Sequence, residues 1–138
     1  MAHWLFKSEP NTWSWGDHVK ASVECWEGVR NYQAASNMKK MKIGDLAYFY
    51  HSIHEKKIVG IVEIVKEYYP DHTDESGRFG MVDLKAIQSF SFPVTLQQIK
   101  EDPRLEHLAL VRQSRLSVMP IDDESWSIIN KIGAPKNI

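Results

Sequence analysis

Cysteine is scarce in this sequence: Cys25 is the only one among 138 residues. A disulfide within the chain is therefore excluded, and such sparse cysteine is typical of a reducing compartment. Long apolar runs are also missing, since no stretch approaches the roughly 20 apolar residues of a membrane helix. The first residues lack the basic and apolar regions of a signal peptide. We expect a protein with no membrane segment, located in the cytoplasm, or associated with the nucleoid if the source is bacterial.

A strong excess of one charge sign is absent as well, because 17 Lys and Arg stand against 18 Asp and Glu, for a formal net charge of −1. This balance argues against binding nucleic acid through bulk electrostatics, which requires clustered Lys and Arg. Two local basic clusters remain, and each is also compatible with an ordinary solvated face. They are Lys39, Lys40 and Lys42, and Arg112 with Arg115. As contacts to a phosphate backbone we predict Lys39, Lys40, Lys42 and Arg112.

The common catalytic and cofactor motifs are missing, since there is no G-x-G-x-x-G, P-loop, G-x-S-x-G or H-E-x-x-H sequence. His51 and His54 are spaced like metal ligands, but no third ligand stands at a defined spacing. The segment from Asp71 to Glu75 is acidic without the EF-hand pattern, so we interpret it as a solvated hairpin tip. These observations predict no catalytic residue, no metal and no cofactor.

The sequence does contain an ordinary globular composition, with 43% apolar and 25% charged residues. Its length suits one domain, which we place over residues 1–138. Apolar and aromatic patterns predict strands at 3–7, 23–26, 46–52, 57–69, 81–90 and 115–121. Capping residues predict helices after Ser14, Asn31, Thr95 and Asp122, with a helical turn at 105–110. The irregular order predicts an α+β fold: a mixed, mostly antiparallel β pseudo-barrel with short helices on its rim.

Aromatic side chains are plentiful, at 11% of the residues, and one of them stands in an unusual setting. In the stretch WEGVRNYQA, Trp26 is followed by Gly28, Arg30 and Asn31. The glycine would let the backbone approach a ligand closely, and the indole would stack on a flat ring. Polar groups at other segment ends complete the candidate set: Lys7, Ser8 and Glu9; Tyr50, His51 and Ser52; Arg115 and Ser117. If these segments converge, they surround a planar heterocycle. The alternative is that the indole plugs the core and Arg30 pairs with a carboxylate.

Six blocks of the chain together resemble the EVE domain family: WLFKSEP, WEGVRNYQA, IGDLAYFYHS, IVGIVEIV, PVTLQQIK and RLSVMPI. They occur in the order of that family and span nearly the whole chain. The resemblance implies a PUA-like fold, related to YTH and ASCH domains, and the binding of nucleic acid. It also implies a pocket for a modified base extruded from DNA, such as cytosine with a 5-substituent. Carried onto this sequence, that pocket comprises Lys7, Ser8, Glu9, Trp26, Gly28, Val29, Arg30, Asn31, Tyr50, His51, Ser52, Arg115 and Ser117.

The resulting hypothesis is a non-enzymatic, monomeric module that reads a modified base in nucleic acid, in DNA in preference to RNA. Two alternatives stay open. One is a small enzyme acting on a nucleotide or modified base, with His51 as acid or base and Arg115 holding charge. The other is an adaptor whose pocket binds a small heterocyclic metabolite.

Overall fold

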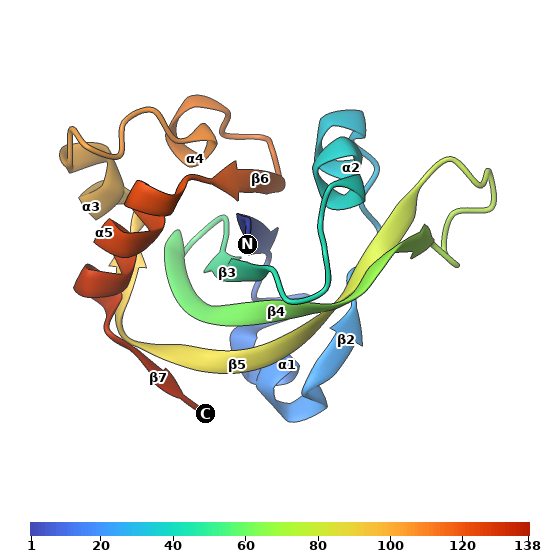
Figure 1. Cartoon of the computed structure of the whole chain (residues 1–138), viewed down its shortest axis with the longest axis horizontal. Coiled ribbons are helices and arrows are strands. Elements are labelled where there is room, and N and C mark those ends of the chain that lie inside the picture. The colour runs from blue at the N-terminus through green and yellow to red at the C-terminus, as the bar shows by residue number, and fades with distance from the viewer.

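The computed structural model describes residues 1–138 as a curved, seven-stranded sheet surrounded by five short helices (Figure 1). The strands are β1 (His3–Ser8), β2 (Val23–Cys25), β3 (Leu46–His51), β4 (Lys57–Pro70), β5 (Gly80–Thr95), β6 (Val118–Ile121) and β7 (Pro135–Asn137). They hydrogen-bond in the order β2-β5-β4-β3-β1-β6, and β7 pairs with β5. Only β1 and β3 are parallel. The sheet does not close into a barrel, because β2 and β6 end this path. The predicted α+β, mostly antiparallel architecture is confirmed.

The five helices are α1 (Trp15–Ala21), α2 (Tyr32–Lys39), α3 (Leu96–Glu101), α4 (Ala109–Arg112) and α5 (Asp123–Gly133). Four of the five begin at the predicted capping residues, and α4 is the exception. Ser14 and Thr95 form capping boxes at α1 and α3, while Asn31 and Asp122 cap α2 and α5 through their side chains. Each cap satisfies a backbone N–H that the first helical turn leaves free. None of the five helices combines the length and apolar character that a membrane crossing requires.

β4 and β5 are long, bent strands that run side by side, with α2 and α4 above them in the view of Figure 1 and α1 at their lower side. A glycine inside a strand predicts a bulge or a close backbone approach, and Gly60 in β4 has both. The register of the β4–β5 pair shifts between Ile58 and Gly60. A Cβ atom at Gly60 would lie 2.3 Å from the Trp15 ring. The bend therefore depends on a residue without a side chain, against which the first helix packs.

β1 lies inside the sheet, between β3 and β6. Its side chains Leu5 and Phe6 are fully buried, together with Tyr48 and Phe49 from β3. Beyond the last paired residue of β6, the Lys7 amide donates a hydrogen bond to the Ser117 carbonyl at 2.9 Å. The polar C-terminal end of β1 is thus held next to the segment that precedes β6.

The C-terminal half departs from the sequence prediction at three strands. β5 continues to Thr95, because its last residues pair with the start of β4. β6 begins only at Val118, since the Leu116 amide donates to the Gln113 carbonyl in a turn (3.1 Å). Arg115 and Ser117 therefore precede the strand instead of lying on it. The short β7 strand follows α5 and is absent from the prediction. The predicted helical turn at 105–110 is present in part: the Leu108 amide donates to the Leu105 carbonyl at 3.2 Å, and α4 follows from Ala109.

Candidate functional site

A cavity of about 570 Å³ opens where the end of β1, the loop after β2 and the segment before β6 meet. We call it the Trp26 cavity. Its volume lies within the usual range for pockets that hold small molecules. The cavity is lined by Lys7, Ser8, Glu9, Thr12, Trp13, Glu24, Cys25, Trp26, Glu27, Gly28, Val29, Arg30 and Ser117.

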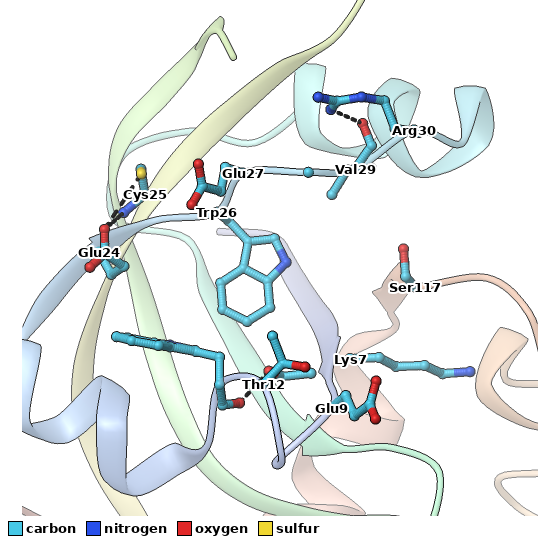
Figure 2. A pocket seen from close by; sticks show the side chains of 13 residues that line it. Lys7, Glu9, Thr12, Glu24, Cys25, Trp26, Glu27, Val29, Arg30 and Ser117 are labelled. Carbon is cyan, nitrogen blue, oxygen red and sulfur yellow. Dashed lines mark hydrogen bonds between the residues drawn. The ribbon is translucent and has the colours of Figure 1, made fainter. Parts of the chain in front are cut away.

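Trp26 is half-buried and serves both the core and the cavity. Its indole packs edge-on against Phe6 and Phe49, with ring centroids 5.6 Å apart in each pair. Figure 2 shows the indole among the lining side chains, with Glu24 and Lys7 on different sides of it. The two sequence interpretations of this residue are therefore both partly correct. Packing fixes the ring, and the remaining surface faces the hollow.

A buried carboxylate holds the loop that follows Trp26. Asp71 accepts hydrogen bonds from the Gly28 amide (2.8 Å) and the Arg30 guanidinium (3.1 Å). It also accepts from the amide and hydroxyl of Thr73. Gly28 has a φ of 86°, in the region that glycine adopts without strain. Burial would raise the pKa of Asp71, but these hydrogen bonds outweigh it and hold the pKa at about 2.

Residues 71–75 lie in the hairpin loop between β4 and β5, as predicted, but Asp71 corrects the interpretation of the whole segment as solvated. Asp71 is buried, whereas the following residues are largely exposed. The expectation that Arg30 pairs with a carboxylate is confirmed. In Figure 2 the Arg30 side chain turns back to the Val29 carbonyl. The loop therefore gains its shape from a residue 43 positions away in the sequence.

A second tryptophan, which the sequence reasoning missed, lines the cavity. The Trp13 indole N–H donates to Nδ1 of His18 at 3.0 Å, and Nε2 of His18 lies 2.8 Å from the Leu84 carbonyl. His18 is fully buried, and burial lowers its pKa. The neutral ring, with its proton on Nε2, satisfies both contacts. The capping box at Ser14 was the available signal, because it places Trp13 directly before α1, with His18 in that helix.

The charged lining of the Trp26 cavity is slightly acidic. It comprises the carboxylates Glu9, Glu24 and Glu27 and the cations Lys7 and Arg30. Carboxylate oxygens accept hydrogen bonds, so they suit a ligand edge that carries N–H donors and disfavour a phosphate. Burial and the neighbouring Glu24 carboxylate raise the pKa of Cys25 to about 11. The thiol is therefore protonated at neutral pH and is a poor nucleophile.

Three predicted pocket residues on β3 and its end lie outside the cavity. Tyr50 is buried in the core. Nε2 of His51 accepts the Trp15 amide at 2.9 Å, and its Nδ1 lies 3.0 Å from the Glu55 carboxylate. Ser52 donates its amide to the Ser8 carbonyl. The parallel register of β1 and β3 brings these residues beside Lys7 and Ser8, but they fill the core and support the start of α1 instead.

Asn31 and Arg115 lie in a separate hollow of about 330 Å³. We call it the arginine groove, and its residues are Asn31, Gln33, Arg112, Gln113, Ser114, Arg115 and Leu116. Arg115 therefore does not line the Trp26 cavity, because the turn before β6 places it in the neighbouring hollow. The side-chain oxygen of Asn31 accepts a hydrogen bond from the Ala34 amide, because Asn31 is the N-cap of α2.

The predicted lysine contacts lie elsewhere, as do the two histidines spaced like metal ligands. Lys39, Lys40 and Lys42 are exposed at the C-terminal end of α2, whereas the arginine groove adjoins its N-terminal end. Both ring nitrogens of His51 contact protein groups, so neither is available to bind a metal together with His54. The ligand atoms of Cys25, Glu27 and His72 lie within 4.8 Å of one another, so this exposed rim cluster could hold a metal. Glu27 and His72 already form an ion pair at 3.0 Å.

Comparisons with known proteins place this geometry in context. The family model described as "EVE domain" matches residues 2–132. Thymocyte nuclear protein 1 from Gallus gallus is 36% identical over an alignment that covers 92% of this chain and 66% of the relative. The human protein of that name is 33% identical, with coverage of 93% and 72%. The chain thus spans about two thirds of the length of these relatives.

Solved structures agree with this relationship. Rpa0253 from Rhodopseudomonas palustris superimposes with a TM-score of 0.91 and 49% identity, covering 97% of this chain and 94% of that chain. Human THYN1 in complex with 5-methylcytosine containing DNA gives a TM-score of 0.90 and 32% identity, with coverage of 96% and 98%. ASCH from Zymomonas mobilis, at 12% identity and a TM-score of 0.56, shares the fold alone. The predicted PUA-like fold and family are confirmed. The chain belongs to the EVE domain family.

Proposed function

We propose that this protein binds nucleic acid and holds one modified base, such as 5-methylcytosine, in the Trp26 cavity. The observation that carries the proposal is the cavity itself, in which a half-buried indole meets a rim of hydrogen-bonding groups. The structural likeness to human THYN1 in complex with 5-methylcytosine containing DNA supports the same choice of ligand.

The chemistry of the lining suits such a base. A cytosine offers its exocyclic amino group as a donor, and the Glu9, Glu24 and Glu27 carboxylates are acceptors. Stacking of one base on an aromatic side chain contributes roughly 1–3 kcal/mol. A base within a duplex must first leave the stack, which costs a few kcal/mol. The cavity lies at the surface, where an extruded base can enter.

Of the two alternatives, the enzyme finds less support in the geometry. His51 and Arg115, the candidate residues of an enzyme, lie in different places: one in the interior beside α1 and the other in the arginine groove. An adaptor for a heterocyclic metabolite would use the same cavity. It would bind the free nucleoside as tightly as an oligonucleotide, so titrating both ligands separates the two functions.

The proposal is tested by replacing Trp26 with leucine, which keeps apolar contact with Phe6 and Phe49 but removes the indole. Affinity for an oligonucleotide with one 5-methylcytosine should fall roughly 5- to 150-fold, since one stacked base contributes roughly 1–3 kcal/mol. Phe92→Ala is the matched control, because Phe92 is an exposed aromatic residue outside the cavity. Fluorescence anisotropy measures affinity, and thermal unfolding checks the fold. A folded Trp26→Leu protein with wild-type affinity would rule out the cavity as the base site.

A further inference from the structure

The arginine groove contains two cations without an acidic partner. Neither Arg112 nor Arg115 takes part in any of the ion pairs of the molecule. Arg112 donates its Nε–H to the Glu106 carbonyl at 2.9 Å, which leaves its two terminal nitrogens free. No Asp or Glu lines the groove. Two free guanidinium groups in one hollow form a site suited to an anion, and their planar donors match the oxygens of a phosphate.

The groove and the Trp26 cavity adjoin one another at three points. Arg30 lines the cavity and Asn31, the next residue, lines the groove. Likewise, Ser117 lines the cavity and its neighbour Leu116 lines the groove. Between them, Lys7 lines the cavity and its Nζ donates to the Ser114 carbonyl in the groove at 2.9 Å. A ligand that fills the cavity can therefore place the group attached to its buried part in the groove.

The charges of the two hollows are complementary to the two parts of a nucleotide. The cavity has three carboxylates and two cations, whereas the groove has two cations and no carboxylate. A neutral base with N–H donors suits the first hollow, and a phosphate suits the second. The groove also lies at the start of α2, where the positive end of the helix dipole adds to the attraction.

We propose that the arginine groove binds the phosphate adjacent to the base in the Trp26 cavity, so that Arg112 and Arg115 are its phosphate contacts. This inference rests on the proposed function. It changes the expected role of Arg115 from base contact to phosphate contact. It also places the main backbone contacts at the N-terminal end of α2, in contrast to the predicted cluster of Lys39, Lys40 and Lys42 at the other end.

The test compares R112Q/R115Q with the wild-type protein at several salt concentrations. The probes are a single-stranded oligonucleotide with one 5-methylcytosine and the free nucleoside 5-methyl-2′-deoxycytidine. Each neutralised phosphate contributes roughly 0.7 to the slope of log Kd against log salt concentration for a single strand. Loss of the contacts to this one phosphate should therefore lower that slope by about 0.7. Nucleoside binding, followed by NMR chemical shifts, should stay the same.

The control is K131Q/K136Q, which removes equal charge from exposed residues of α5 and β7, outside the groove. It should keep the wild-type slope. An unchanged slope in R112Q/R115Q, or an equal loss of nucleoside binding, would overturn the phosphate role. So would a loss of slope in K39Q/K40Q alone. Oligonucleotide binding that depends on the arginines but not on Trp26 would support the groove and reject the base cavity. No binding by the wild-type protein would reject both.

Discussion

Replacing Asp71 with asparagine tests whether one buried carboxylate supports the wall of the Trp26 cavity. The native hydrogen bonds lower the pKa of Asp71 from 3.8 to about 2. For a fully buried side chain this difference corresponds to about 2 kcal/mol of unfolding free energy. Because the folded-state pKa is depressed, the stabilisation is complete above about pH 5. It is lost as the pH falls through 3.8 toward 2.

The assay is chemical denaturation of the wild-type protein and Asp71→Asn between pH 7 and pH 2. At pH 7 the variant should unfold with about 2 kcal/mol less free energy, because the Arg30 ion pair is lost and an amide replaces a carboxylate. The difference between the two proteins should shrink toward pH 2. Asp122, whose pKa is also about 2, titrates in both proteins and cancels in the comparison.

Glu75→Gln is the matched control, since Glu75 is an exposed carboxylate in the same loop. It should leave the pH dependence of stability unchanged. Parallel curves for the wild-type protein and Asp71→Asn would refute the reasoning, as would equal stability at pH 7. Asp71→Asn should also weaken oligonucleotide binding, because the Gly28 amide and the Arg30 guanidinium lose the carboxylate that anchors them.

Three further predictions concern the scaffold. Gly60→Ala should lower the unfolding free energy by about 1–3 kcal/mol through overpacking against Trp15, whereas Gly16→Ala, which has more space, should show no such loss in thermal melts. Tyr48→Phe should cost about 1 kcal/mol in urea denaturation, because the buried hydroxyl contacts the Trp126 carbonyl and the Asn130 side chain. NMR titration should show the His18 ring still neutral below pH 6.5. Because the pKa of His18 is lowered in the folded protein, stability is lost as the pH falls below 6.5. A ring that protonates at pH 6.5 or higher would contradict the role of burial.

Local signals explain why the helix starts could be predicted from the sequence. Each capping side chain accepts a hydrogen bond from an amide three residues later, so the sequence around each helix start holds both partners of the bond. The four caps are Ser14, Asn31, Thr95 and Asp122. Gly60 was equally informative, because a glycine within an apolar strand usually marks a bulge or a close backbone approach. The type and order of most elements followed from such short-range patterns.

The site depended on long-range contacts that the sequence does not display. His51 and Ser8 are neighbours in a parallel pair, yet His51 turns to the Trp15 amide, a contact that only the packed α1 creates. Arg115 moved to another hollow because a turn shortens β6. In the sequence Asp71 is one of several charged residues in a polar loop. Its structural role depends on a hydrogen bond from the Gly28 amide, 43 residues earlier. Polar composition alone could not separate a structural carboxylate from a solvated one.

The position of β1 has a consequence for biogenesis. This strand leaves the ribosome before the other six strands, but it requires a partner on each side, and one of these is β6, which follows it by more than a hundred residues. A nascent polypeptide that stops before Ser117 would present β1 as an unpaired edge, which other chains could join. The ligand pocket would also lack a wall at that stage. We therefore expect recognition to arise only after β6 has been synthesised, and truncation before β6 to produce aggregation instead of a weaker binder.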